Sequence, residues 1–284
     1  MMRRVITLAK AENRRKNLLL VLALVMVNLG GSAAFALDPM GPPVAGLLKG
    51  ELKGQADYSR STMDLKLSEG KGVVYIDGVF QASWQEPSVT IKDFKINKGY
   101  VGLGYGVSLN CEAFLRMGAT SSKFGDSLWE EGEKFDGSTD FTLGGGLKAT
   151  FYERENLKIG GVFQANWAKF DGKLEVPTVA ADDLIGIDLM EMQIAIGAIR
   201  TWTERVSIYG GPFVHLVNGD FDYAFSRAEG GLQTFKYSWD IKEGLTYGGY
   251  IGARLKLAED WSFDIEYQHT EDANLFGASL MLRY

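Results

Sequence analysis

Apolar and polar residues alternate with a period of two through most of the chain after residue 100. In one clear run, Trp261, Phe263, Ile265 and Tyr267 alternate with Ser262, Asp264, Glu266 and Gln268. This period is that of a β-strand with one apolar and one polar face. It predicts strands over 100–109, 113–120, 141–152, 158–170, 188–202, 206–217, 245–257, 261–268 and 276–284.

Short and long connections alternate between these strands. The short turns lie near residues 110–112, 154–156, 203–205 and 258–260, and the long connections are 122–139, 171–187 and 220–243. If apolar positions face one another across each hairpin, every short turn holds three residues. The resulting register pairs Leu109 with Ala113, Phe151 with Ile159, Trp202 with Val206, and Leu257 with Trp261.

Residues 50–97 carry a weaker signal. In 50–67, Leu52, Ala56 and Tyr58 share one phase but Met63, Leu65 and Leu67 share the other, which predicts a first strand with a bulge or phase slip near 59–61. Residues 69–97 hold two short β-rich pieces, 73–80 and 89–96, and are interpreted as a possible extracellular hairpin insert.

Alternation of short turns with long loops is typical of bacterial outer-membrane barrels, where the turns are periplasmic and the loops extracellular. The predicted fold is therefore all-β: a transmembrane, antiparallel up-and-down β-barrel over residues 50–284. Nine strands from Tyr100 onward and one in 50–67 give about ten strands, with eight and twelve as alternatives.

The N-terminal region has the layout of a secretory signal peptide. A basic stretch precedes the apolar run 18–29, and small residues lead to Ala34-Phe35-Ala36. The apolar run is shorter than the roughly 20 residues that a membrane-spanning helix needs. We therefore expect a signal peptide at 1–36, cleaved after Ala36, and an irregular periplasmic lead-in at 37–49.

Removal of residues 1–36 leaves 24 basic and 35 acidic residues, a formal charge of −11. This charge argues against a nucleic-acid partner, which calls for a basic face. The single cysteine, Cys111, rules out an internal disulfide.

The apolar face carries aromatic residues near both ends of the predicted strands, as expected for girdles at the two membrane interfaces. Near the short turns lie Phe151, Trp202, Trp261 and Tyr284, and near the long loops lie Phe141, Trp167, Tyr247, Tyr267 and Phe276.

The opposite face is charged and predicts a lumen network of Arg254, Asp264, Glu266, Lys256, Arg116, Lys148, Glu191 and Arg283. Such charges can form a selective constriction or a set of salt bridges that fills a narrow barrel. Because eight-stranded barrels are filled by their own side chains, the filled interpretation is favoured for ten strands.

Catalysis has little support. The predicted register places His215 inward, opposite Gln193, and His269 outward near the loop end, without a nucleophile beside it. We expect no enzyme activity, no catalytic residues, no cofactor and no metal site, since Cys/His clusters are lacking.

The strand rhythm, Ala34-Phe35-Ala36 and the final Leu280-Met281-Leu282-Arg283-Tyr284 resemble the small outer-membrane β-barrel proteins of Gram-negative bacteria. The similarity is to the outer-membrane protein A barrel, outer-membrane protein W and the opacity and adhesin-like proteins. It implies export to the outer membrane, contact with lipid and lipopolysaccharide, and insertion by the barrel-assembly machinery through the 280–284 signal.

The leading functional expectation is a monomer with a structural or surface-interaction, adhesin-like role carried by segments 69–97, 122–139, 171–187 and 220–243. A narrow porin-like channel for ions or small polar solutes is the alternative. A lipid-modifying barrel enzyme that uses His269 is the minor alternative.

Overall fold

The computed structural model describes residues 37–125, 134–175, 183–228 and 231–284, so the expected signal peptide lies outside the described residues. These residues form one antiparallel sheet. Its strands are β1 (Leu52–Leu67), β2 (Gly70–Ile76), β3 (Val79–Glu86), β4 (Val89–Ser108), β5 (Cys111–Gly125), β6 (Lys134–Gly137), β7 (Asp140–Arg154), β8 (Leu157–Glu175), β9 (Asp183–Thr201), β10 (Val206–Ala228), β11 (Leu232–Lys256), β12 (Trp261–Thr270) and β13 (Ala273–Arg283). None of the described residues belongs to a helix long and apolar enough to cross a membrane.

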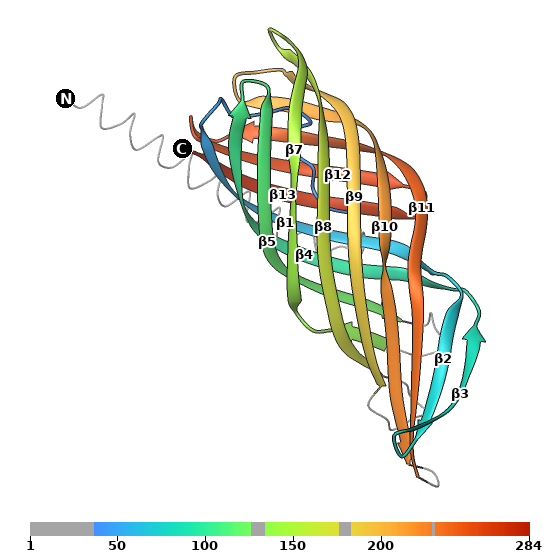
Figure 1. The fold of residues 1–284 in the computed structure, drawn as a ribbon. Helices are drawn as coiled ribbons and strands as arrows, with labels where there is room; N and C mark the ends of the chain where they lie inside the picture. The colour runs from blue at the N-terminus through green and yellow to red at the C-terminus, as the bar shows by residue number, and fades with distance from the viewer. Residues whose placement is uncertain (1–36, 126–133, 176–182, 229–230) are drawn as a thin grey trace, which may run out of the picture. The chain divides into compact units, whose positions relative to one another are not determined.

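Ten of the strands close into a ring (Figure 1). Pairing runs β1-β4-β5-β7-β8-β9-β10-β11-β12-β13, and β13 returns to β1 along a ladder from Lys53 with Arg283 to Met63 with Ala273. The chain is therefore a closed up-and-down barrel, which confirms the predicted fold class and the number of ring strands.

Two of the four predicted hairpin registers are correct up to the turn, as the pairs Ser207 with Thr201 and Arg254 with Asp264 show. In the β7–β8 hairpin the predicted register holds at Thr150 with Gly160, but an irregularity between Thr150 and Tyr152 pairs Ile159 with Tyr152 and not with Phe151. The fourth is wrong because β4 has an irregularity between Gly106 and Ser108 and turns through two residues, so Ala113 pairs with Tyr105. That shift is an even number of residues and leaves the inward and outward faces unchanged.

Of the bulge or phase slip predicted near 59–61 in β1, the phase slip is wrong. The ladder with β13 is regular from Lys53 to Met63, and the odd-numbered residues face inward throughout. A register shift does occur toward β4, between Leu52 and Leu65. What changes along β1 is the chemistry of the lumen, which is polar around Asp57 and apolar around Leu65.

Much of the sequence assigned to long loops is strand. β10 and β11 stay paired out to Ala228 with Leu232, so segment 220–243 is mainly a hairpin. β5 and β8 likewise extend to Gly125 and Glu175. β8, β10 and β11 have 19, 23 and 25 residues, more than the roughly 10 residues that cross a membrane. They therefore project beyond the membrane at the end of the barrel opposite the short turns.

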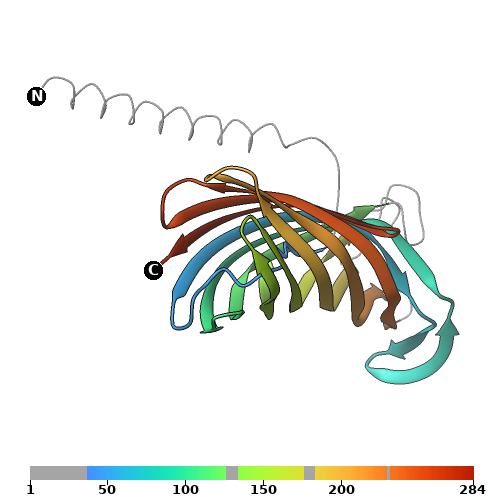
Figure 2. The ribbon, with the colours of Figure 1, turned by 90° about the horizontal axis from the view of Figure 1, so that it is seen from above.

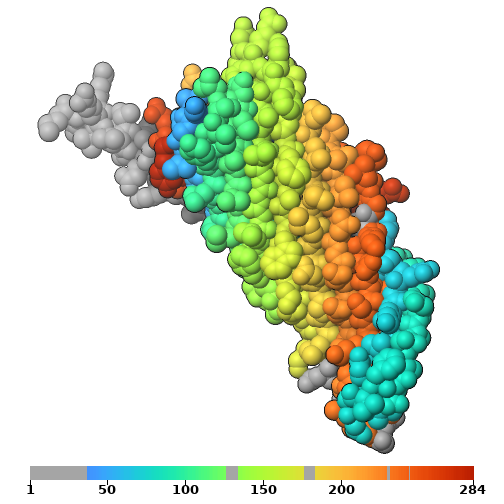
Figure 3. All heavy atoms as spheres, in the orientation of Figure 1, coloured from blue at the N-terminus to red at the C-terminus, as the bar shows by residue number. Residues whose placement is uncertain are grey.

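The predicted insert at 69–97 is partly confirmed. β2 and β3 form a hairpin that adds to the projecting part of β11, through pairs such as Phe235 with Val74. Figure 3 shows this hairpin in cyan against the ends of β10 and β11 in orange. The second β-rich piece, Val89–Ile96, is instead the first part of the ring strand β4.

We call the end with the short turns, Leu52 and Tyr284 the turn end, and the opposite end, with the β2–β3 hairpin, the loop end. Between them the outer wall exposes large apolar side chains, for example Leu115 at 71% and Ile196 at 59%. A water-exposed wall of this kind would be costly, whereas lipid covers it without cost. The barrel is thus of the membrane-spanning type.

Candidate functional site

The most informative part of the lumen holds a piece of the chain itself. Residues Leu37–Leu47, here called the inner segment, have no regular secondary structure, and Leu37, Asp38, Met40 and Leu47 are almost completely buried. The segment, in blue, runs within the curved wall of strands (Figure 2). The predicted irregular conformation is thus found, but the predicted place outside the barrel is wrong. The sequence alternation could not reveal this, because the segment has no strand partner.

Side chains from the strands donate hydrogen bonds to the carbonyls of the inner segment. The carbonyl of Asp38 accepts from Gln164 Nε2 at 3.0 Å and Gln268 Nε2 at 2.8 Å. The next two carbonyls, of Pro39 and Met40, accept from Arg116 Nη1 at 3.0 Å and Lys148 Nζ at 2.6 Å. Four donors from four strands therefore replace the ladder partners that the segment lacks.

Carboxylate and hydroxyl groups accept the segment's amides in turn. Glu266 takes the N–H groups of Met40 and Gly41 at 2.9 and 2.8 Å. Nearer the turn end, Thr150 Oγ1 accepts from Ala45 at 3.1 Å. Glu112 Oε2 accepts from Gly46 at 2.9 Å.

The side chain of Asp38 is held by a buried charge cluster. Its carboxylate lies 3.0 Å from Lys98 Nζ and 3.7 Å from Arg116 Nη2, and Tyr100 donates its hydroxyl at 3.1 Å. Lys98 also contacts Glu191 at 3.0 Å. The two cations therefore balance the charge of the Asp38 carboxylate in the interior of the barrel.

The predicted lumen network falls into separate groups. Arg116, Lys148 and Glu266 hold the inner segment, and Glu191 holds Lys98. The predicted pair Arg254–Asp264 is present and bidentate, at 2.8 and 2.7 Å.

The last two predicted members lie at the turn-end mouth. Lys256 and Arg283 are both exposed, and Arg283 donates to the carbonyl of Gly46 at 2.8 Å. They contribute to the rim of the lumen and not to its buried network.

Sequence reasoning missed Asp38, Lys98 and the Lys53–Glu112 ion pair. Continuing the alternation of β4 back from Gly102 would have placed Lys98 on the inward face. The inward phases of β8 and β12 would have done the same for Gln164 and Gln268.

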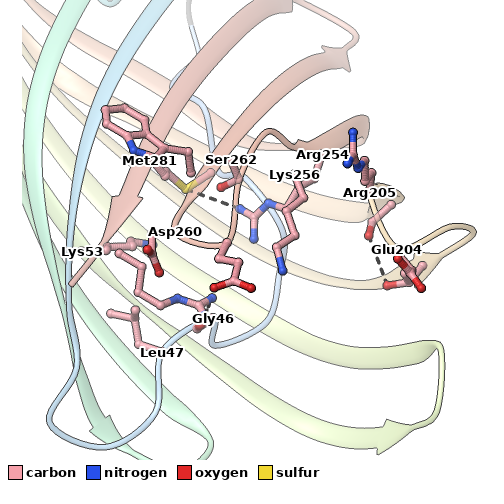
Figure 4. A pocket seen from close by; sticks show the side chains of 15 residues that line it. Gly46, Leu47, Lys53, Glu204, Arg205, Arg254, Lys256, Asp260, Ser262 and Met281 are labelled. Atoms are coloured by element: carbon pink, nitrogen blue, oxygen red, sulfur yellow. Dashed lines mark hydrogen bonds between the residues drawn. The ribbon is translucent and has the colours of Figure 1, made fainter. Parts of the chain in front are cut away.

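A pocket of about 260 Å³ opens at the turn end, where the inner segment leaves the lumen (Figure 4). It is bordered by Gly46, Leu47, Lys53, Thr201, Glu204, Arg205, Ser207, Arg254, Lys256, Glu259, Asp260, Trp261, Ser262, Met281 and Arg283. Leu48, the next residue along the chain, is 59% exposed. Water therefore reaches the exit of the segment, whereas Asp38 lies deep in the barrel.

Toward the loop end the lumen is apolar. The residues that fill it are fully or nearly fully buried and include Met63, Leu65, Leu67, Ile91, Phe94, Ile96, Phe124, Phe135, Phe170, Ile185, Ile187, Leu189, Val217, Phe221 and Ile241. Phe94 packs edge-on against Phe170 at a centroid distance of 5.9 Å. The lumen thus has a polar half around the inner segment and an apolar half beyond it.

The sequence matches no protein-family model and no curated protein. Solved structures similar to the chain include the translocator domain of the autotransporter NalP from Neisseria meningitidis, at 12% identity over 97% of this chain and 95% of that one, with a TM-score of 0.40. The toluene transporter TbuX from Ralstonia pickettii is 10% identical over 90% and 95%, with a TM-score of 0.43. The outer membrane protein OprG from Pseudomonas aeruginosa is 10% identical over 84% and 98%, with a TM-score of 0.39.

The barrel fold that the expected resemblance implied is shown by the closed ladder of the chain itself.

The predicted girdle residues lie on the outer face. Eight are exposed, namely Phe141, Phe151, Trp167, Trp202, Tyr247, Trp261, Tyr267 and Tyr284, and Phe276 is half-buried. Phe141 and Trp167 lie beside each other, with ring centroids 6.5 Å apart. They border the apolar wall at the loop end.

The two histidines lie in different surroundings. His269 is exposed on the outer face, and its Nδ1 lies 2.5 Å from Asn274 Oδ1. His215 is buried opposite Gln193, as predicted, but its Nε2 has no hydrogen-bond partner among the described residues. In that part of the chain no group of His, Cys, Asp and Glu could hold a metal ion.

Proposed function

We propose that this protein is an outer-membrane β-barrel with a closed lumen and a structural or surface-interaction role carried by its loop end. The observation that carries the proposal is the filling of the lumen in two layers. The inner segment occupies the polar half, and the packed side chains around Phe94 and Phe170 occupy the apolar half. An ion would have to displace both.

The charged lumen residues therefore do not favour the porin-like alternative. A selective constriction needs charges that face a water path. Here Arg116, Lys148 and Glu266 are buried, and each makes at least one hydrogen bond to the main chain of the inner segment.

The loop-end surface has features of an interaction site. The β2–β3 hairpin turns through Asp77-Gly78, both with positive φ, and exposes Val79 at 62% and Phe80 at 54%. β3 pairs with β2 alone among the described strands, so its other edge is open to a partner. Exposed apolar side chains beside an open edge favour contact with another molecule.

Location and partners complete the proposal. The apolar wall and two aromatic girdles suit the outer membrane, with lipid and lipopolysaccharide as neighbours. β13 pairs with β1 and closes the ring, which suits a role of segment 280–284 as the signal for the barrel-assembly machinery. A non-enzymatic role is supported by the contact of His269 with Asn274, which is not a nucleophile.

Planar-bilayer recording of the refolded protein tests the closed lumen. We expect no conductance from the full chain, and none from a variant that lacks residues 37–48, because the apolar half stays packed. Discrete steps from the full chain, with insertion verified, would sink the proposal.

Deletion of the β2–β3 hairpin tests the surface role. Because Leu67 pairs with Val89, residues 69–87 can be replaced by a short turn without disturbing the ring. The variant should keep the heat-modifiable gel mobility of a folded barrel and lose binding of bacteria to host cells or to one another. Binding equal to that of the full chain would assign the role to another surface.

A further inference from the structure

The inner segment is held in the way that a peptide ligand is held. Nine hydrogen bonds reach its main chain between Asp38 and Gly46, and in each of them the partner is a side chain of a strand. Contacts of this kind depend on the path of the main chain and not on the identity of each residue. The polar half of the lumen therefore binds the backbone N–H and carbonyl groups of the segment.

One side chain of the segment is recognised by its charge. Asp38 lies at the deepest part of the polar half, against Lys98 and Arg116, and its side chain is 0% exposed. Charge-assisted hydrogen bonds are the stronger ones, so this carboxylate dominates the selectivity of the site. The other side chains that enter the lumen are apolar or small.

The wall is shaped to the path of the segment. A Cβ on Gly160 would lie 2.4 Å from the Pro43 carbonyl oxygen, and one on Gly277 would lie 2.7 Å from the Pro39 ring. A Cβ on Gly106 would lie 1.9 Å from the Leu48 carbonyl oxygen. Three strands thus have glycine where the segment passes, and they form a groove along it.

The segment is joined to the barrel by one short connection. Gly50 and Glu51 exchange backbone hydrogen bonds with Gly106, at 2.8 and 3.0 Å, and β1 begins directly afterwards. Leu48 is exposed beside the turn-end pocket. If this connection is cut, nothing covalent retains the segment, and its exit is already open to water.

We propose that the polar half of the lumen is an exchangeable peptide-binding site, which the inner segment occupies in cis. The ligand that it takes is a peptide that follows the same irregular path, with a carboxylate near its N-terminal end and apolar, small or proline residues after it. Entry is from the turn end. This activity is separate from the surface role of the loop end, and either can fail without the other.

The test uses the full chain with a protease recognition sequence inserted after Leu48. After cleavage, a peptide of residues 37–48 with a fluorophore at its C-terminal end is added to the barrel in detergent, and bound label is measured by anisotropy. We expect saturable uptake that unlabelled peptide reverses. Mass spectrometry should show the cut segment in the released fraction.

Peptide variants test how the site reads its ligand. Asp38→Asn should weaken binding at least about tenfold, because it removes a buried charge-assisted contact. Leu48→Asn, at an exposed position, is the matched control and should bind like the parent peptide. Equal binding of a scrambled peptide would overturn the proposal.

A fixed segment is the contrary outcome. If the cut segment is not replaced by labelled peptide over several days, or if the emptied barrel takes up none, the segment is a permanent core element. A barrel refolded without residues 37–48 gives a second measurement of uptake. If that barrel does not fold, the cut chain decides the question.

Discussion

Replacement of Lys98 by methionine tests whether the buried charge cluster holds the inner segment in place. Lys98 Nζ lies 3.0 Å from Asp38 and 3.0 Å from Glu191, and all three side chains are essentially inaccessible to water. Lys98→Met keeps the volume but leaves two carboxylates together without their shared cation. Breaking a buried ion pair in this way costs about 3–5 kcal/mol, or two to four orders of magnitude in the folding equilibrium.

The matched control is Lys169→Met. Lys169 also contacts an aspartate, Asp171, at 2.9 Å, but both side chains are about half exposed. An exposed pair contributes about 0–1 kcal/mol, so this variant should unfold almost like the parent protein. The two substitutions therefore differ in burial and not in the chemistry removed.

Urea unfolding of the refolded barrel in lipid vesicles, followed by tryptophan fluorescence and gel mobility, measures both variants. A loss for Lys98→Met within about 1 kcal/mol of the control would refute the reasoning. Adding Glu191→Gln to Lys98→Met should restore most of the stability, because Asp38 still faces Arg116 and no unpaired carboxylate is then left beside it.

Three other experiments test the arrangement. Gly277→Leu should drive Pro39 from the groove and make the inner segment sensitive to protease, because the Pro39 ring is the nearest group to a Cβ at this position. Gly99→Leu, where a Cβ meets no atom within 4 Å, should not. Leu115→Arg on the outer wall should lower stability by about 2–4 kcal/mol in lipid, and normal stability would contradict a membrane-facing wall. In intact cells, a membrane-impermeant maleimide should not label Cys111, which lies at the turn end. The same reagent should label a cysteine introduced by Ser83→Cys in a protein that also carries Cys111→Ser. Labelling of Cys111 would show that the orientation is the reverse of the predicted one.

The ring of strands could be predicted because alternation reports the two sides of a single wall. The apolar outer face is continuous from strand to strand, so the phase of each strand and most hairpin registers follow from it. The length of the strands could not be predicted in this way. Where β10 and β11 leave the membrane, the outer face becomes polar while Phe221 and Trp239 stay buried inside, so the alternation reverses its polarity and resembles a loop.

The inner segment escaped prediction for a different reason. Its residues Pro39, Pro42 and Pro43 and its glycines have the composition of a surface linker. The signals that place it in the lumen lie elsewhere in the chain, on inward positions such as Gln164, Gln268 and Lys98. Inward polar side chains that lack a cross-strand partner indicate that the lumen holds another group with which they form hydrogen bonds.

This same segment accounts for the change in polarity along β1. The inward residues of β1 run from Lys53 and Asp57 to Met63, Leu65 and Leu67 without a change of face. Main chain without ladder partners needs donors and acceptors from its surroundings, and the hydrogen bonds to the inner segment all fall between Asp38 and Gly46. Farther toward the loop end than Asp38, the strands do not face a main chain that needs hydrogen-bond partners. Close-packed apolar side chains are then the more stable filling. The apparent phase slip in the sequence therefore marks the boundary between a lumen that binds backbone and a lumen that packs on itself.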